Sequence, residues 1–339
     1  MTVEHAAAGP GAGLGPGPAV LAVDVGGTDT KAALIDDGGT VREVLRRPTP
    51  RDAARPAERV VDEVVRAVAE LRGRHPDVEP EGLGLVVPGI VDDERGVGVR
   101  SENLGWRDAP FADLATARLG LPVAVGHDVA AAGWAECRLG AAAGYQDAMV
   151  VALGTGISAA LVLGGRPYRG GGLAGEIGHA RVAEEPGCVC GGRGCLEQVA
   201  SAAAVARRYC EATGTPVPGA REVLAAAAAG DPTAVAVWDD ALDALALGLS
   251  HAVALLAPQV IVLGGGLSQA GDALLGPLGV RLDALLTYHR RPLLTRALLG
   301  EDAGVLGASL LARDLLARDL LTRDLSAREP ATPTTGVEP

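Results

Sequence analysis

A short buried strand, a glycine loop and a second strand follow one another twice in this chain, and this repeat constrains the fold most. The first copy lies at 20–35 around Asp24-Val25-Gly26-Gly27-Thr28, and the second lies at 149–163 around Gly154-Thr155-Gly156. A Walker loop or a dinucleotide loop would open a helix after its glycines, and neither pattern is present. The repeat predicts two similar halves within one chain.

The glycine loops have two open interpretations, phosphate binding or ordinary β-turns. Bare glycine backbone lets amide N–H groups approach a phosphate closely, and the hydroxyl of Thr28 would donate one more hydrogen bond. A third loop, Gly264-Gly265-Gly266, follows the strand expected at 260–263. It would let a flat ring lie against the backbone, or it is a tight turn. Two such loops facing each other would hold a polyphosphate from both sides.

Three cysteines and a histidine have the spacing of a closed zinc site. His179 precedes Cys188, Cys190 and Cys195, and the glycines between the cysteines allow three sulfurs to surround one ion. The alternatives are buried or redox-active thiols and half of a disulfide framework, which fits poorly with five cysteines in a long chain. Glu176 and Glu197 flank the cluster, so the metal would hold a loop that presents polar groups to a ligand.

Asp128 is the candidate general base. It follows the strand expected at 122–125 and precedes an alanine-rich helix, and open α/β sheets place ligand chemistry beyond the carboxyl ends of strands. An acceptor hydroxyl needs a group that takes its proton while a phosphoryl group moves in line. An aspartate before a helix is equally often an N-cap, and the residues alone leave both roles open.

Composition excludes several classes of protein. Aromatic residues make up 2% of the chain and the net charge is −12, which argues against nucleic-acid stacking and phosphate-backbone binding. No apolar run has the length of a membrane span, and the N-terminal Ala, Gly and Pro residues do not resemble a secretory signal. We therefore expect a cytoplasmic protein without nucleic-acid or membrane partners, and 48% hydrophobic residues are enough for a large core.

The ordered motifs together resemble bacterial ROK sugar kinases of the glucokinase type over roughly residues 20 to 310. The resemblance is carried by Asp24-Val-Gly-Gly-Thr, Pro88-Gly89-Ile-Val-Asp92, Glu102-Asn103-Leu-Gly-Trp106, Gly154-Thr-Gly156, Glu176-x-x-Gly-His179, Cys188-x-Cys-Gly-x-x-Gly-Cys195-x-Glu197 and Gly264-Gly-Gly266. It implies an α/β fold of the duplicated actin-like ATPase type (ribonuclease H-like), in which two domains flank a cleft and a zinc-stapled loop is present.

The resemblance also implies roles for individual residues. Asp128 matches the base that deprotonates a sugar 6-hydroxyl, and Asp24 matches the acid that holds Mg²⁺ through water. Sugar contacts are implied at Gly89, Asn103, His127, Asp128, Glu176, His179 and Glu197. ATP contacts are implied at Asp24, Gly26, Gly27, Thr28, Lys31, Gly154, Thr155, Gly156, Gly264, Gly265 and Gly266. His179 would ligate structural Zn²⁺ with Cys188, Cys190 and Cys195 through one ring nitrogen and meet the sugar with the other.

His127 departs from the family pattern, which usually has asparagine before the catalytic aspartate. The kinase chemistry is expected to be retained, with glucose as the sugar and N-acetylglucosamine or N-acetylmannosamine as alternatives. Polyphosphate is the alternative to ATP as donor. A sugar-responsive ROK regulator would need a DNA-binding region, and the residues before Asp24 carry no helical pattern or basic face. A non-catalytic sugar-binding protein is disfavoured by the presence of both Asp24 and Asp128.

Domain boundaries follow from the same motifs. We expect disordered tails at 1–19 and 330–339, a small domain at 20–123 closed by a C-terminal helix at about 304–325, and a large domain at 124–303 that includes the zinc loop. The expected assembly is a homodimer or homotetramer. Near the C-terminus a five-residue repeat of the type Leu-Leu-Ala-Arg-Asp spreads its leucines around the whole helix, which predicts a partly exposed helix or a self-association element.

Overall fold

The computed structural model describes residues 13–52 and 54–328, with side chains described as far as residue 321. The strands are β1 (Val20–Val25), β2 (Asp29–Ile35), β3 (Val41–Pro48), β4 (Gly82–Val87), β5 (Ile90–Asp92), β6 (Val97–Arg100), β7 (Arg107–Ala109), β8 (Val123–His127), β9 (Ala148–Leu153), β10 (Ile157–Leu163), β11 (Arg166–Tyr168), β12 (Val260–Gly264) and β13 (Leu293–Arg296). The α-helices are α1 (Pro56–Arg74), α2 (Phe111–Leu119), α3 (Asp128–Leu139), α4 (Leu196–Ala200), α5 (Ala202–Thr213), α6 (Ala220–Ala228), α7 (Pro232–Leu256), α8 (Asp272–Leu285) and α9 (Ala303–Arg328). Short 3₁₀ turns are η1 (Gly170–Gly172), η2 (Ile177–His179), η3 (Gly266–Ala270) and η4 (Gly300–Asp302).

The same strand order occurs in two five-stranded sheets. The first sheet has the order β3-β2-β1-β4-β8 and the second has β11-β10-β9-β12-β13. In each sheet the first three strands pair antiparallel and the last two join in parallel. The predicted repeat of strand, glycine loop and strand is therefore confirmed as the antiparallel pairs β1–β2 and β9–β10. A separate three-stranded sheet, β5-β6-β7, follows β4.

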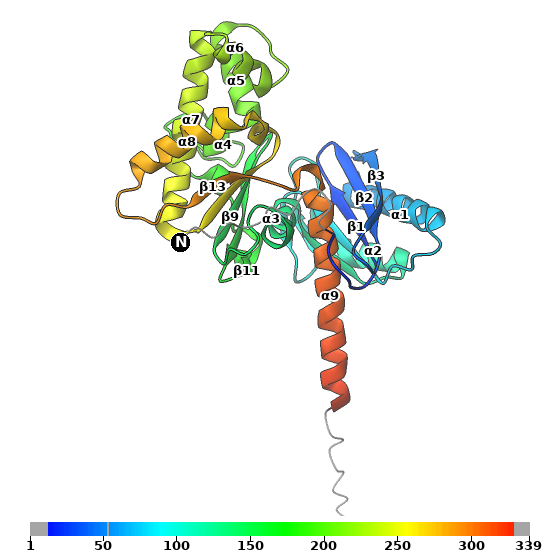
Figure 1. Cartoon of the computed structure of the whole chain (residues 1–339). Helices are drawn as coiled ribbons and strands as arrows, with labels where there is room; N and C mark the ends of the chain where they lie inside the picture. The colour runs from blue at the N-terminus through cyan, green and yellow to red at the C-terminus, as the bar shows by residue number, and fades with distance from the viewer. Residues whose placement is uncertain (1–12, 53, 329–339) are drawn as a thin grey trace, which may run out of the picture.

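Helices cover both faces of each sheet. Helices α1 and α2 pack on one face of the first sheet, where Phe111 and Leu71 are fully buried. Helix α9 covers the other face. Helices α4 to α8 enclose one face of the second sheet in the largest apolar cluster. We call the first and three-stranded sheets with α1, α2 and α9 the N-terminal half, and the second sheet with α4 to α8 the second half (Figure 1).

Helix α3 lies between the two halves and touches both. Its Ala131 belongs to the apolar cluster formed with α9 and the first sheet, and its Cys137 belongs to the cluster on the face of the second sheet that α4 to α8 leave free. Glycines bring these backbones together. A Cβ at Gly307 of α9 would lie 2.2 Å from Ala131 O, and a Cβ at Gly133 would lie 2.2 Å from the Ala160 methyl carbon on β10. Both positions therefore require glycine.

Residues 13–19 differ from the expected disordered tail. The Leu14 amide donates to Gly39 O at 3.0 Å, and the Arg313 guanidinium of α9 donates to Gly15 O at 2.7 Å and Pro18 O at 3.0 Å. The segment is held because these carbonyl groups satisfy an arginine that has little access to water. The rest of the two predicted tails, 1–12 and 330–339, lies outside the described residues.

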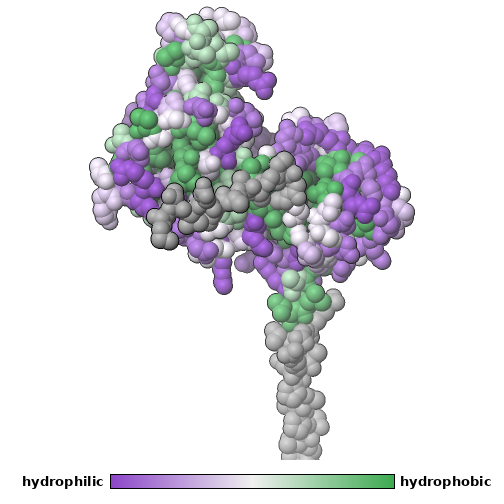
Figure 2. Space-filling model, in the orientation of Figure 1, coloured by the Kyte–Doolittle hydropathy of each residue, from purple (hydrophilic) through white to green (hydrophobic). Residues whose placement is uncertain are grey.

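The C-terminal helix starts on the body of the protein and then leaves it (Figure 1). Leu311 and Leu316 are buried, whereas Leu320 and Leu321 are 63% and 65% exposed. Figure 2 shows this apolar surface where α9 emerges from the body. The leucines of the repeat do not form one stripe, as predicted, because a five-residue step rotates by about 140° around the helix. None of the described helices has the length and apolar character needed to cross a membrane.

The contact between α9 and β4 can be tested at Gly84. A Cβ at this position would lie 1.8 Å from Ala308 O, so we expect Gly84→Ala to lower the free energy of unfolding by about 1–3 kcal/mol through overpacking. Gly73→Ala is the matched control because Gly73 lies in α1 with no atom within 4 Å of its added Cβ. The control should be neutral or more stable in urea unfolding. Equal stability of both variants would contradict the assigned packing.

Candidate functional site

Asp128 lies where β8 ends and α3 begins, and His127 takes the capping position. His127 Nδ1 accepts the Ala130 N–H at 3.4 Å, and Asp128 Oδ1 accepts the Val129 N–H at 2.7 Å. The N-cap interpretation of Asp128 is therefore wrong, since the residue before it caps the helix. Within the described part of the chain, Asp128 Oδ2 has no hydrogen-bond partner and stays available as a proton acceptor.

The imidazole of His127 lies close to the Asp128 carboxylate. Its Nε2 is 3.1 Å from Asp128 Oδ1, and its Nδ1 is occupied by the backbone of α3. Because Nδ1 accepts a hydrogen bond, it carries no proton. In a neutral ring the proton is then on Nε2, which faces the carboxylate. His127 thus adds positive potential at Asp128, which an asparagine at this position would not do.

Asp24 and Asp128 form a pair of desolvated acids. Burial, and secondly the nearby Asp128 charge, raise the pKa of Asp24 to about 6, while Lys31 opposes this rise. Burial also raises the pKa of Asp128, opposed by His127 and the Val129 N–H. Lys31 lies opposite Asp24 in the β1–β2 register and donates to Glu301 O at 2.6 Å. The pair can accept protons near neutral pH and can attract a cation.

The first turn of α9 packs directly against Asp24. A Cβ at Gly304 would lie 2.1 Å from Asp24 Oδ2, so any larger residue here would displace the Asp24 carboxylate. The N-terminus of a helix carries partial positive charge, which favours a carboxylate beside it. Gly304 lies in the closing helix expected at about 304–325, and its contact with the site was not predicted, because a lone glycine in a helical segment gives no signal of its partner.

The second and third glycine loops meet at one edge of the second sheet. Gly154 donates its N–H to Gly156 O at 3.0 Å, and a Cβ at Gly265 would lie 2.5 Å from Leu153 O, directly before Gly154. Gly265 has a φ of +80°, which favours glycine. Gly266 has open space where a Cβ would be. Bare backbone therefore lines this edge of the sheet, and a ring lying against it stays a prediction.

The first glycine loop belongs to the other sheet. Gly26 donates its N–H to Asp29 O at 2.9 Å and accepts the Thr49 hydroxyl at 2.7 Å. Gly27 is half-buried, whereas Thr28 and Thr155 are exposed. The two repeats therefore supply loops from opposite halves, one after β1 and one after β9.

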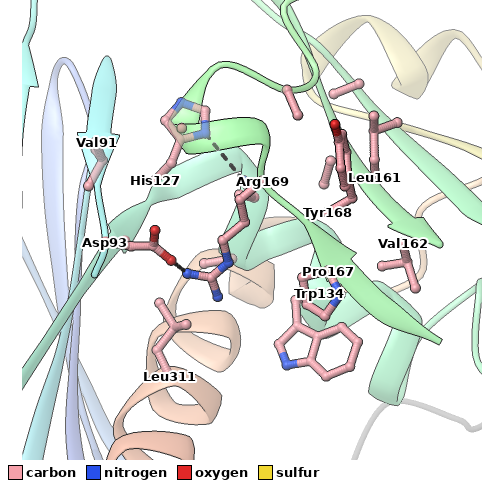
Figure 3. A pocket seen from close by; sticks show the side chains of 17 residues that line it. Val91, Asp93, His127, Trp134, Leu161, Val162, Pro167, Tyr168, Arg169 and Leu311 are labelled. Carbon is pink, nitrogen blue, oxygen red and sulfur yellow. Dashed lines mark hydrogen bonds and ion pairs between the residues drawn. The ribbon is translucent and has the colours of Figure 1, made fainter. Parts of the chain in front are cut away.

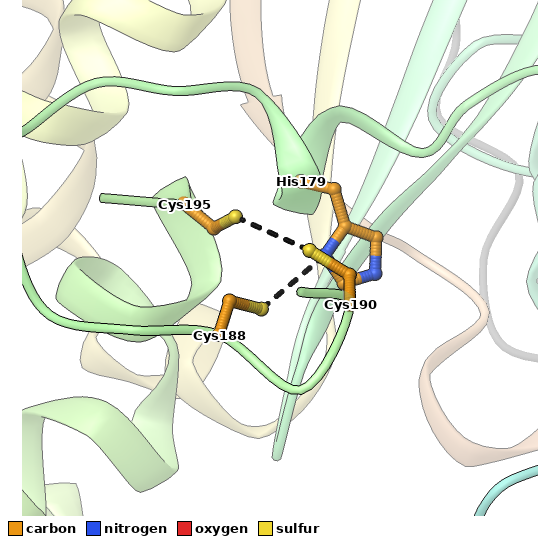
Figure 4. A group of neighbouring side chains, drawn as sticks. All are labelled: His179, Cys188, Cys190 and Cys195. Carbon is orange, nitrogen blue, oxygen red and sulfur yellow. Dashed lines mark hydrogen bonds between the residues drawn. The ribbon is translucent and has the colours of Figure 1, made fainter. Parts of the chain in front are cut away.

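His179, Cys188, Cys190 and Cys195 are brought together, and their candidate ligand atoms all lie within 4.8 Å of one another (Figure 4). The sulfurs of Cys190 and Cys195 are 3.6 Å apart, and Cys188 Sγ is 3.7 Å from His179 Nδ1. Ligand atoms around a tetrahedral zinc ion lie about 3.7 Å apart, so the four groups fit a structural zinc site. Cys137 is buried and Cys210 half-buried, both outside this cluster.

Two carboxylates surround the cluster. Glu197 Oε1 is 3.9 Å from His179 Nδ1, and its Oε2 accepts the Ile157 N–H at 3.4 Å. A Cβ at Gly156 would lie 2.7 Å from the same oxygen, which places Glu197 between the cluster and the second glycine loop. Glu176 Oε2 is 3.8 Å from His179 Nε2. Nδ1 therefore faces the thiols and Nε2 faces outward, toward Glu176.

The remaining predicted contacts come from the N-terminal half. Gly89 follows β4, and β8 ends alongside it because Val87 pairs with His127. Asn103 lies exposed in the turn between β6 and β7, and it forms no hydrogen bond with the other candidate residues in the described part of the chain. An ion pair between Asp93 and Arg169 lies beside this group and was missed. Charged residues 76 positions apart give no sequence signal of a contact.

Comparison with known proteins gives consistent matches over most of the chain. The glucokinase of Streptomyces coelicolor is 32% identical over 311 residues, covering 85% of this chain and 96% of that protein. The crystal structure of a ROK hexokinase from Thermus thermophilus has a TM-score of 0.79 at 35% identity and covers 89% of this chain and 99% of that one. The ROK glucokinase of Streptomyces griseus, solved with glucose and AMPPNP, has a TM-score of 0.74 at 33% identity and covers 87% and 99%.

The model of the ROK family matches residues 20–315, from the first strand of the first sheet into the C-terminal helix. This range includes both glycine repeats, the acid pair and the cysteine cluster described above. The chain therefore belongs to the ROK family.

Proposed function

We propose that this protein is a hexose kinase that transfers the terminal phosphoryl group of ATP to the 6-hydroxyl of glucose. The observation that carries the proposal is the open carboxylate oxygen of Asp128, which lies at the strand end between the two halves. The Streptomyces griseus relative bound to glucose and AMPPNP supports it. Family membership and the acid pair together favour a kinase over a sugar-responsive regulator or a non-catalytic binding protein.

In the proposed reaction, the oxygen of the sugar 6-hydroxyl attacks the terminal phosphorus of ATP while Asp128 Oδ2 accepts the hydroxyl proton. The bond between that phosphorus and the bridging oxygen breaks, and ADP leaves. Asp24 would hold Mg²⁺ through water, and the ion would balance the charge of the phosphates. The glycine loops after β1, β9 and β12 would position the nucleotide, with Lys31 beside Asp24. Gly89, Asn103, His127, Glu176, His179 and Glu197 are the proposed sugar contacts.

The cysteine cluster is proposed to be a structural zinc site. Nδ1 of His179 would join the three thiolates, which fixes the ring so that Nε2–H points outward as a donor to the sugar. Glu197 would be held by the same cluster and by the Ile157 N–H. The zinc ion would act through these two side chains, without touching the reacting atoms.

The proposed domains follow the two sheets. A small domain at 20–123 is closed by α9 at about 304–325, and a large domain covers 124–303. Their closure on sugar and nucleotide would exclude water that otherwise competes as phosphoryl acceptor. The proposed assembly is a homodimer or homotetramer, in which the exposed leucines of α9 are one candidate contact.

The test of the function is an ADP-release assay of the purified protein with glucose, N-acetylglucosamine, N-acetylmannosamine, mannose and fructose. Each sugar is assayed with ATP and with polyphosphate. We expect the highest kcat/KM for glucose with ATP. If only an N-acetylhexosamine is phosphorylated, that sugar replaces glucose as the assigned substrate. If no combination of sugar and phosphoryl donor gives turnover, the kinase assignment is rejected.

Asp128→Asn should lower kcat by about 100-fold to 10,000-fold, because the amide cannot accept the proton. Glucose binding, followed by calorimetry without nucleotide, should change little. Asp113→Asn is the matched control, since Asp113 is an exposed aspartate in the first turn of α2. A variant with near-normal kcat would reject Asp128 as the base.

The rate of phosphoryl transfer should fall as the pH is lowered through about 6. The pKa of Asp24 is raised to about 6, so this acid loses its charge as the pH falls through that range, and burial raises the pKa of Asp128 in the same direction. Initial rates with glucose, taken between about pH 5 and pH 8, should therefore drop on the acid side. Raised carboxyl pKa values make the folded state more stable as pH falls, so thermal unfolding over the same range serves as the control. Constant kcat/KM down to pH 5 would contradict the acid pair.

Cys190→Ser should remove zinc and raise the KM for glucose by about tenfold or more, because His179 and Glu197 lose their anchor. Zinc is measured by elemental analysis of the purified protein. Cys210→Ser is the control, since Cys210 lies outside the cluster and accepts the Val217 N–H at 3.3 Å. One zinc per chain in the Cys190 variant would count against the assigned ligands.

A further inference from the structure

An ion pair between Asp93 and Arg169 joins the two halves of the protein beside the candidate sugar site (Figure 3). Asp93 comes from the N-terminal half, directly after β5, and Arg169 comes from the second half, directly after β11. The two side chains are 17% and 35% exposed. The pair is therefore partly shielded from water, and charge interactions in such a place are stronger than at an open surface.

Asp93 is connected to a proposed sugar contact by a short rigid segment. β5 begins directly after Gly89 and ends directly before Asp93. Gly89 has a φ of +105°, and a Cβ there would lie 2.1 Å from Arg100 O, so its backbone is pressed against β6. A displacement of Asp93 would therefore displace Gly89.

Arg169 anchors the loop that leads to another proposed sugar contact. Its carbonyl accepts the N–H groups of Gly172 at 2.9 Å and Ala174 at 3.1 Å. The following residue, Gly175, accepts the Ala159 N–H at 2.8 Å and precedes Glu176. The guanidinium of Arg169 thus binds the opposite half while its backbone holds the segment that carries Glu176.

A backbone contact lies next to the ion pair. A Cβ at Gly172 would lie 2.3 Å from Val91 O in the middle of β5, so the two halves touch here without a side chain between them. The ion pair and this contact together define the spacing between the Gly89 segment and the Glu176 segment.

The space around the pair is too small for a sugar. The adjoining cavity, lined by His127, Trp134, Arg169 and Leu311, has a volume of about 40 Å³. A cavity of this volume holds a few water molecules, since one water molecule needs about 10–15 Å³ of such space. Arg169 and Asp93 therefore act on the sugar site through the segments that they hold.

We propose that Asp93 and Arg169 are positioning residues, whose ion pair holds the Gly89 and Glu176 segments at the spacing at which both contact one sugar molecule. This inference rests on the proposed function. The neighbouring charges on α9, Asp314 and Arg318, act on Arg169 with opposite signs, so they do not replace Asp93. Loss of either partner leaves the other charge shielded and unpaired, which costs more than loss of both.

The test measures steady-state kinetics of Asp93→Asn, Arg169→Gln, the double variant and the exchange Asp93→Arg with Arg169→Asp. We expect each single variant to raise the KM for glucose by about tenfold and to change kcat by less than about twofold. The KM of the double variant for glucose should be no higher than that of either single variant. The exchange variant should recover a KM near that of the unmodified protein.

Asp240→Asn is the matched control because it removes the Arg208–Asp240 pair, 2.7 Å apart, which lies within the second half alone. Its KM for glucose should not change. Unchanged KM in the Asp93 and Arg169 variants, or increases that simply add in the double variant, would overturn the proposal even if thermal stability falls.

Small-angle scattering of the unliganded proteins separates this inference from the proposed function. The radius of gyration should be larger for Asp93→Asn and Arg169→Gln than for the unmodified protein and Asp240→Asn. If the unmodified protein phosphorylates no sugar, the proposed function fails, and this measurement still decides whether the pair holds the halves together. Equal radii for all four proteins, together with unchanged KM, would overturn it.

Discussion

The packing of α3 between the two sheets is the contact on which the rest of the structure depends. The helix begins at Asp128, touches α9 through Ala131 and Gly307, and touches β10 through Gly133 and Ala160. Backbone contacts of this kind leave no side chains to rearrange, so the start of α3 has a defined position relative to both sheets. A carboxylate at its first residue therefore lies where loops from both halves can reach the same ligand.

The site combines two ways of placing charge. Burial raises the pKa of Asp24 and Asp128, and the Asp128 charge adds to the rise at Asp24, so this region favours a proton or a cation. At the other side of the site, His179 lies in the cysteine cluster and Glu197 accepts the Ile157 N–H. Under the proposed function, the first group would serve proton and phosphate chemistry, and the second would hold hydroxyl groups.

Local patterns predicted the elements and the residue clusters well. The glycine repeats, the ligand spacing from His179 to Cys195 and the helix after Asp128 all depend on neighbours in sequence, and the structure contains each of them. Residues whose roles come from distant partners were not predicted. Gly304 against Asp24, Arg169 against Asp93 and Arg313 against Gly15 each join segments far apart in the chain, and no local periodicity reports such a contact.

The N-cap of α3 is another case in which the sequence alone left the role of a residue open. An aspartate before a helix suits both an N-cap and a base, and only the backbone conformation at His127 decides between them. His127 extends the strand and turns its ring back to Ala130, so Asp128 becomes the first helical residue.

The location of α9 has a consequence for biosynthesis. Its first turn packs on Asp24 and its next turns cover the sheet formed by the earliest strands, although the whole second half lies between these strands and α9 in the chain. One apolar face of the first sheet therefore stays uncovered during translation until α9 has been synthesised. A nascent chain that lacks α9 can have the second half folded and still have no assembled acid pair.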